Sequence, residues 1–113
     1  MKTVVKEGIA FKDMKKYLPK RYGDLFPANF RNREESVNAV IFPYDKARGV
    51  ITSSCIQKIL DQLKDPALLT VYFASSFSTE AKALAKENNG LIFCLSNYEW
   101  TDESWHKCKN GCL

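Results

Sequence analysis

The chain lacks the residues and motifs on which many enzyme mechanisms depend. Its 113 residues include a single histidine, and they contain neither a glycine-rich phosphate loop nor a paired Cys-x-x-Cys motif. One histidine leaves serine–histidine and multi-histidine metal mechanisms without their parts, and the missing loop argues against dinucleotide binding. With five glycines, four prolines and no internal repeat or low-complexity linker, the sequence predicts one domain spanning residues 1–113.

Long apolar runs are also missing. The longest mainly apolar stretch, residues 67–74, is far shorter than the roughly 20 residues that cross a bilayer, so we expect no membrane partner. Val4 and Val5 are followed at once by Lys6 and Glu7, so no signal-peptide core develops. The sequence therefore predicts a cytoplasmic protein with reduced thiols. In their apolar segments, Cys55 and Cys94 are expected to be buried.

Positive charge is concentrated in the first half of the chain. Residues 1–50 hold eleven Lys and Arg against six Asp and Glu, whereas residues 51–113 hold six against seven. A basic surface neutralises phosphates and releases counterions, which makes nucleic acid a candidate partner. A net charge of +4 serves solubility equally well, so a merely solvated basic surface is the alternative.

The middle of the chain predicts an α/β fold. Residues 37–42, 68–74 and 91–95 are apolar and rich in β-branched or aromatic side chains, which indicates three buried strands. Between them, residues 51–64 and 78–89 show helical spacing, with Thr52 to Ser54 and Ser76 or Ser78 as N-terminal caps. Gly90 is expected to supply the left-handed residue that ends the second helix. We expect a βαβαβ core with a mainly parallel sheet flanked by helices.

The remaining segments divide into an N-terminal and a C-terminal part. Residues 1–36 are expected to form a helical and loop region, with a short helix over residues 11–18 that Pro19 ends and an ordered loop over residues 20–36. Residues 37–97 hold the βαβαβ core. Residues 98–113 are expected to form a C-terminal helix and tail, beginning near Thr101.

A family resemblance rests on the second half of the core. The residues that carry it are Ser75-Ser76-Phe77-Ser78-Thr79-Glu80-Ala81, with Ala85 and Asn88-Asn89, followed by the strand Leu91-Ile92-Phe93. This stretch, residues 68–97, resembles the last strand, helix and strand of the Mrr-type restriction endonuclease-like family. The resemblance implies a restriction endonuclease-like topology and, in active members, a nuclease that uses a divalent metal.

The metal-binding pattern of that family is not found in this chain. Such nucleases place an acidic or Gln residue two positions before a Lys on one strand, where both side chains project from the same face. The strand predicted at residues 37–42 has neither. The triplets at residues 13–15 and 80–82 have the spacing but lie in predicted helices, where positions i and i+2 diverge by about 200°. The chain is therefore expected to be a non-catalytic binding module, with no catalytic residue, metal or cofactor assigned.

A basic set of residues is the candidate nucleic-acid surface, because lysines interleaved with aromatic side chains can hold single strands. Serines at helix starts are further candidates for phosphate contacts, although plain helix capping is the alternative for them. Tyr17, Tyr22 and Phe30 are the interleaved aromatics, and Tyr22 and Phe30 are also candidates for the core. The candidate residues are Lys12, Lys15, Lys16, Lys20, Arg21, Arg31, Arg33, Ser76 and Ser78.

Two other functions stay open at this stage. Trp100 and Trp105 lie in a polar setting, and they either cover the core or form a patch for another protein or a second copy of the chain. A protein-interaction or inhibitor module is therefore the first alternative. A minimal metal-dependent nuclease, with Asp45 as the residue to test, is the second. His106, Cys108 and Cys112 offer three zinc-type ligands but no fourth, so no metal site is expected there.

Overall fold

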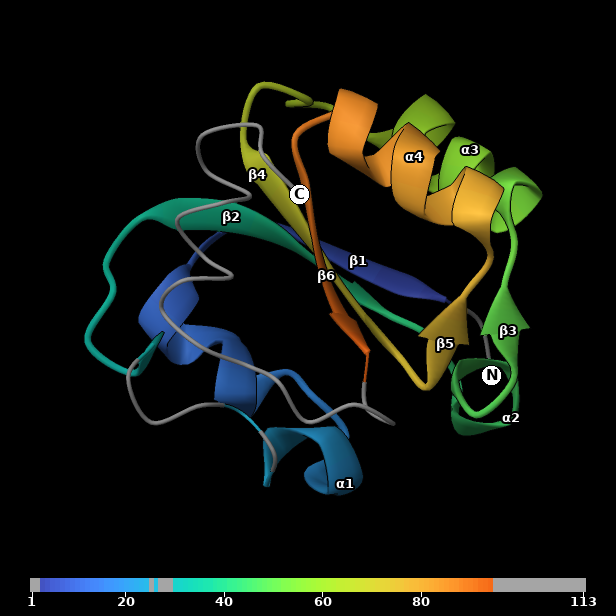
Figure 1. The fold of residues 1–113 in the computed structure, drawn as a ribbon. Coiled ribbons are helices and arrows are strands. Elements are labelled where there is room, and N and C mark those ends of the chain that lie inside the picture. Colours follow the sequence, from blue (N-terminus) through green and yellow to red (C-terminus); the bar gives the residue numbers. More distant parts are fainter. Residues whose placement is uncertain (1–2, 25, 27–29, 95–113) are drawn as a thin grey trace.

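The computed structural model describes residues 3–24, 26 and 30–94, and the expected helix at residues 98–113 lies outside this part of the chain. Within it, four strands form one mixed sheet in the order β1-β2-β4-β6 (Figure 1). The strands are β1 (Val4–Ala10), β2 (Ser36–Ile41), β4 (Leu69–Ala74) and β6 (Gly90–Cys94). The helices α3 (Ser53–Gln62) and α4 (Thr79–Glu87) connect the last three.

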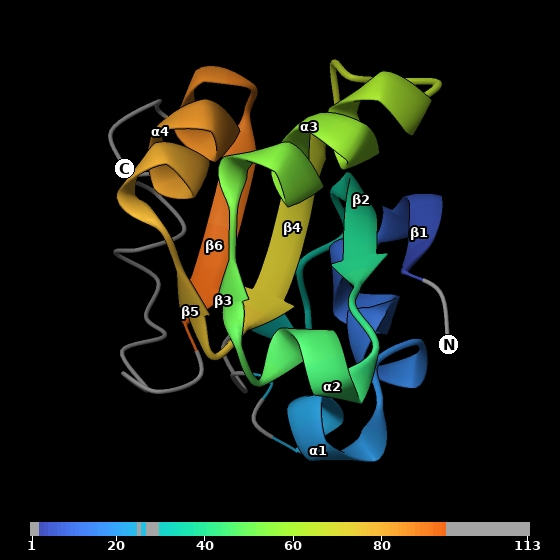
Figure 2. The same ribbon diagram turned by 90° about the vertical axis from the view of Figure 1, so that its right-hand side faces the viewer.

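The parallel core agrees with the sequence-based prediction. β2 pairs in parallel with β4, and β4 pairs in parallel with β6, so the three strands point the same way (Figure 2). Every residue of β2 after Ser36, and every residue of β4 after Leu69, is buried. Burial on both faces explains why these strands lack the polar alternation of a half-exposed sheet.

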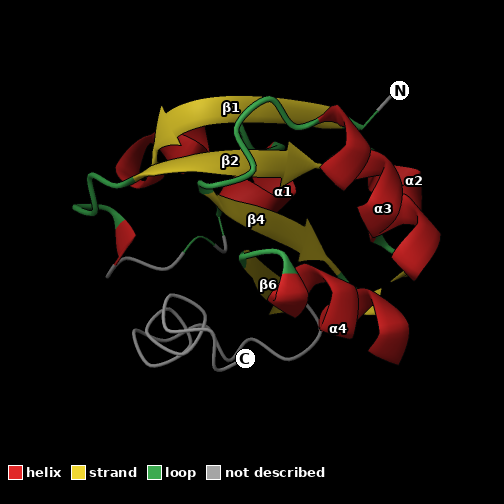
Figure 3. Ribbon diagram, turned by 90° about the horizontal axis from the view of Figure 1, so that it is seen from above, coloured by secondary structure: helices red, strands yellow, loops and turns green. Residues whose placement is uncertain are grey.

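Helices α3 and α4 cover one face of the sheet (Figure 3). The stripe predicted on α3 is confirmed: Ile56 and Ile59 are buried, and Leu60 and Leu63 pack against the core. α4 contributes only alanines to the buried layer, Ala81 and Ala85, so it lies close to the sheet. A Cβ on Gly90 would meet the Ala85 carbonyl oxygen at 2.7 Å.

Aromatic side chains fill the opposite face. Phe26 lies 6.4 Å from Phe73 of β4, and Phe30 lies 5.9 Å from Phe93 of β6, measured between ring centroids. Phe11 contacts both Phe26 and Phe30. It opens the 3₁₀ helix η1 (Phe11–Lys16), which is followed by the short helix α1 (Lys20–Gly23). The aromatic side chains of the irregular N-terminal region therefore cover the face of the sheet that α3 and α4 leave open.

The sequence predicts only helix and loop in the N-terminal region, but the structure also has a strand there. Residues 4–10 form β1, which pairs antiparallel with β2 at the edge of the sheet. The register shifts between Lys6 and Ile9, where Gly8 has a φ of 70°. Lys6 and Glu7 place charges at consecutive positions, on both faces of the strand, so the sequence lacks the alternation of apolar and polar residues by which strands are recognised.

A second, smaller sheet joins the starts of the two helices. β3 (Val50–Ile51) pairs in parallel with β5 (Ser76–Phe77), and the Ser78 amide donates to the Ile51 carbonyl at 2.9 Å. A short helix, α2 (Tyr44–Ala47), lies between β2 and β3. Strands of two residues carry too little pattern to be found in a sequence.

Three local expectations need correction. Ser78 caps α4 as predicted, accepting a hydrogen bond from the Ala81 amide, but the Thr52 side chain does not cap α3. Asn89, with a φ of 57°, is the left-handed residue after α4, and Gly90 is needed for close approach instead. The side chains of Cys55 and Cys94 are half-buried rather than fully buried.

Candidate nucleic-acid interface

The predicted basic residues fall into two groups in the structure. Most lie on η1, on α1 and in the turn that precedes β2, whereas Ser76 and Ser78 lie beyond the carboxyl end of β4. β1 runs antiparallel to β2 and pairs Ala10 with Ser36, so η1 starts at the opposite end of the sheet from Ser76. The serines and the first residues of η1 therefore do not form one continuous surface.

The two serines have structural partners. The Ser76 hydroxyl donates to the Gly49 carbonyl at 3.4 Å, beside the β3–β5 ladder. The Ser78 hydroxyl accepts from the Ala81 amide at 3.1 Å, which satisfies one of the free amides at the start of α4. Both side chains therefore have structural partners, but only Ser78 caps a helix, whereas Ser76 bonds to the carbonyl of Gly49.

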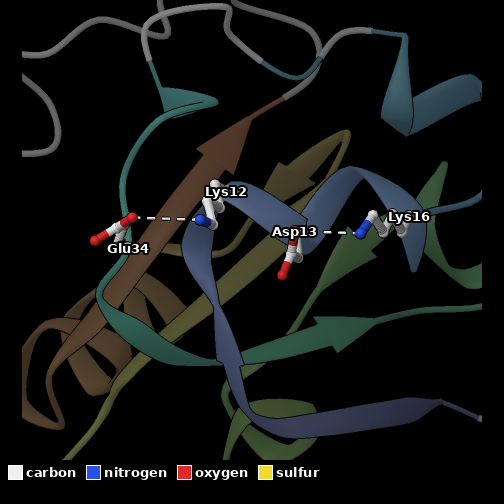
Figure 4. Close-up of polar contacts among 4 residues, drawn as sticks. All are labelled: Lys12, Asp13, Lys16 and Glu34. Carbon is white, nitrogen blue, oxygen red and sulfur yellow. Dashed lines mark hydrogen bonds and ion pairs between the residues drawn. The ribbon is translucent and has the colours of Figure 1, made fainter.

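Two of the lysines on η1 are paired with carboxylates (Figure 4). Lys12 Nζ lies 3.3 Å from Glu34 Oε1, and Lys16 Nζ lies 3.4 Å from Asp13 Oδ1. Because a 3₁₀ helix has three residues per turn, Lys12 aligns with Lys15, while Lys16 aligns with Asp13. Lys12, Lys15 and Lys16 therefore do not share one face of η1. Exposed pairs of this kind contribute little to stability, and an approaching polyanion can compete for the ammonium groups.

The other members differ in their surroundings. Lys15, Lys20 and Arg31 are exposed, and among the described residues none of them forms an ion pair. Arg33 lies over the Phe30 ring, with Cζ 5.7 Å from the centroid. The side chain of Arg21 lies outside the described part. Lys15 and Lys20 are therefore the uncompensated charges closest in sequence to the end of η1.

An exposed tyrosine lies between these two lysines in the sequence. Tyr17 follows η1 with 42% of its surface exposed, whereas Phe30, the other described member of the interleaved aromatics, is fully buried. Lys6 of β1 adds a further cation, with Nζ 5.7 Å from the centroid of the Tyr17 ring. Sequence reasoning missed Lys6 because it belongs to an unpredicted strand. We name Lys6, Lys15, Tyr17 and Lys20 the Tyr17 surface.

Cys55 has the most polar thiol environment in the described part of the chain. It lies in the first turn of α3, where the Thr52 hydroxyl donates to its sulfur at 3.6 Å. Burial raises the pKa of the Cys55 thiol, but the bonds to Thr52 and the charges of Lys46 and Lys58 outweigh it, so the pKa lies below its usual value. Burial raises the pKa of Cys94, and Lys82 opposes this effect only in part.

Carboxylates do not converge within the described residues. No group of three or more His, Cys, Asp or Glu side chains there is arranged to hold a metal ion. Asp45 lies in α2 and pairs with Arg48 at 3.7 Å, and Glu80 and Lys82 both lie on α4, as the sequence predicted. The one histidine, His106, lies outside the described part. Nor does any described helix have the length and hydropathy to cross a bilayer.

Comparison of the chain with protein-family models, with curated proteins and with solved structures gives no match. The resemblance to the Mrr-type family therefore stays a prediction.

Proposed function

We propose that this protein is a non-catalytic module that binds single-stranded nucleic acid through the Tyr17 surface, on a degenerate restriction endonuclease-like fold. The observation that supports the proposal is an exposed aromatic ring flanked by cations: Lys6 lies against Tyr17, and Lys15 and Lys20 are nearby in sequence. A base stacks on such a ring while the ammonium groups neutralise the adjoining phosphates. Duplex DNA hides its base faces, so a stacking surface favours single strands.

A restriction endonuclease-like fold that has lost its metal-binding residues would explain why no catalytic residue is assigned to this chain. β2, β4 and β6 with α3 and α4 follow the order of elements expected from the family resemblance. β2, SVNAVI, carries neither the acidic residue nor the lysine that metal-dependent cleavage in that family requires. A chain that keeps such a scaffold without this pair would hold nucleic acid without cutting it.

The experiment is a binding titration with a labelled single-stranded oligonucleotide at several salt concentrations. We expect the affinity to fall steeply with salt, with a slope near −0.7 for each phosphate that the lysines neutralise. Tyr17→Ala should weaken binding by about 1–3 kcal/mol without changing this slope, because a stacking contact releases no counterion. Lys15→Ala and Lys20→Ala should each reduce the slope by about the contribution of one phosphate.

Lys58→Ala, on the exposed side of α3, is the matched control and should leave both affinity and slope unchanged. Equal affinity of the Tyr17→Ala variant and the unaltered chain would contradict the stacking proposal. If no oligonucleotide binds at low salt and the chain self-associates in sedimentation, the protein-interaction alternative is favoured. Magnesium-dependent cleavage that Asp45→Ala abolishes would favour the nuclease alternative.

A further inference from the structure

One side of η1 extends the Tyr17 surface towards the start of that helix. A 3₁₀ helix has three residues per turn and rises about 2 Å per residue, so Lys12 lies one turn, about 6 Å, before Lys15 on the same side. Phe11 and Met14 are buried against the core, which leaves Lys12 and Lys15 on the exposed side. A strand that stacks a base on Tyr17 and contacts Lys15 can therefore continue along η1 to Lys12.

The backbone holds Glu34 beside Lys12. The Phe11 amide donates to the Glu35 carbonyl at 2.7 Å, and the Lys12 amide donates to the Arg33 carbonyl at 2.7 Å. These two bonds fix the turn before β2 against the start of η1, with Glu34 between the two acceptors. The Glu34 carboxylate reaches Lys12, with Oε1 3.3 Å from Nζ (Figure 4). The ion pair thus adds a side-chain contact to a junction that the backbone already makes.

The exposure of this ion pair makes it easy to exchange. The Glu34 side chain is 79% exposed and the Lys12 side chain is 41% exposed. An exposed pair contributes little to stability, because water and salt screen it. A nucleic-acid phosphate competes well with such a carboxylate, because condensed counterions are released when a lysine neutralises the phosphate. A phosphate can therefore replace the carboxylate without loosening the fold.

We propose that Glu34 acts as an intramolecular phosphate mimic, which holds Lys12 in the free protein and is displaced by a phosphate of the bound single strand. This inference rests on the proposed function and extends it, since the strand then runs from Tyr17 along η1 and contacts Lys12 as well as Lys15. The ion pair is an autoinhibitory contact at the end of the binding surface. Breaking it adds one phosphate contact to those that the Tyr17 surface provides.

A titration with a labelled oligothymidylate of about 12 nucleotides, at several salt concentrations, tests this exchange. Lys12→Ala should weaken binding and reduce the salt slope by about 0.7, the contribution of one phosphate. Glu34→Gln should strengthen binding by up to about fivefold at low salt, because no ion pair has to be broken. Its slope should equal that of the unaltered chain, because Lys12 neutralises a phosphate in both complexes.

Glu87→Gln is the matched control. It removes the same charge from an exposed side chain of α4, which covers the other face of the sheet. This change should affect the affinity less than Glu34→Gln does. In a Lys12→Ala background, Glu34→Gln should gain no more than Glu87→Gln, because the cation that Glu34 holds is absent. Urea unfolding midpoints of all variants should stay close to that of the unaltered chain, since each altered side chain is exposed.

Equal gains from Glu34→Gln and Glu87→Gln, each introduced singly, would overturn the inference, and so would a slope that Lys12→Ala leaves unchanged. A steeper slope in Glu34→Gln would also contradict it, because Lys12 would then stay bound to Glu34 in the complex of the unaltered chain. These results leave the proposed function intact if Tyr17→Ala still weakens binding. An unaltered chain that binds no oligonucleotide at low salt would instead overturn the proposed function together with this inference.

Discussion

Asn38 is a fully buried polar residue in the centre of β2, and its side-chain amide has partners on every side. Its Oδ1 accepts from the Gly8 amide at 3.2 Å, and its Nδ2 donates to the Asp65 carbonyl at 3.0 Å. A third contact, to Thr70 Oγ1, is 3.5 Å long. One amide therefore satisfies the bulge of β1 and the loop that follows α3.

Asn38→Ala should lower the free energy of unfolding by about 1–3 kcal/mol, because it removes a fully buried amide whose hydrogen bonds satisfy partly buried backbone groups. Asn88→Ala is the matched control. Asn88 donates to the Leu84 carbonyl at 2.8 Å in an exposed position, so water replaces the lost bond and the change should stay within about 0.5 kcal/mol. Urea denaturation measures both, and equal losses would show that the Asn38 network is not a buried one.

Thiol chemistry separates the two described cysteines. Since the pKa of Cys55 lies below its usual value and that of Cys94 above it, iodoacetamide at neutral pH should modify Cys55 first. A thiol whose pKa is one unit lower holds about ten times more thiolate at neutral pH. Thr52→Val, which removes the hydroxyl donor, should slow modification of Cys55 and leave Cys94 unchanged. Mass spectrometry of the modified peptides gives the rates, and faster reaction at Cys94 would contradict this assignment.

At the scale of elements, the end of α4 lies close against the start of β6. The Ala85 carbonyl oxygen would lie 2.7 Å from a Cβ on Gly90, and the oxygen belongs to backbone that cannot rotate away. A side chain at position 90 would push α4 off the sheet. The fully buried residues of α4 are alanines, and their short side chains cannot fill the resulting gap.

Gly90→Ala is therefore expected to destabilise the protein by about 1–3 kcal/mol, the usual cost of overpacking. Gly49→Ala provides the comparison, because the nearest atom to its added Cβ is the Lys46 carbonyl oxygen at 3.6 Å, an ordinary contact. That change should be neutral or raise stability by up to about 1 kcal/mol through the unfolded state. Thermal or urea unfolding distinguishes them, and a neutral Gly90→Ala would mean that α4 moves freely over β6.

For the molecule as a whole, the parallel core could be predicted because burial on two faces leaves long apolar runs, as in β2 and β4. The edge strand β1 could not, since Lys6 and Glu7 put charges on both of its faces and leave no alternation of apolar and polar residues. The sequence predicted only part of the Tyr17 surface. It could not show that Tyr17 is exposed and Phe30 buried, because that depends on which ring the irregular N-terminal segment turns towards the sheet. Lys12 was not recognised as paired because Glu34 is 22 residues away in sequence.

The stability of the whole protein should decline in alkali through Tyr72. Its side chain is fully buried in β4, the hydroxyl has no hydrogen-bond partner among the residues that the structure describes, and burial raises the pKa above its ordinary value. The folded state therefore keeps the phenol proton at a pH where the unfolded chain releases it. This contribution is fully present below about pH 10, the ordinary pKa of tyrosine, and is lost as the pH rises towards the folded-state pKa.

Tyr72→Phe should reduce this alkaline loss, and at neutral pH it should raise the free energy of unfolding by about 1 kcal/mol by removing a buried hydroxyl without a partner. Urea unfolding between neutral pH and about pH 11 tests both expectations. A variant that is less stable than the unaltered chain at neutral pH would show that the hydroxyl is satisfied, for instance by a buried water.

The ladder between β3 and β5 has a consequence for how the protein opens. It joins Ile51 to Phe77, and each of these residues lies two positions before the first residue of a helix. Neither α3 nor α4 can then leave the sheet alone without breaking the hydrogen bonds that also anchor the other. Exchange of core amide protons with solvent should accordingly report a single opening event for both helices, so that the helical layer behaves as one cooperative unit.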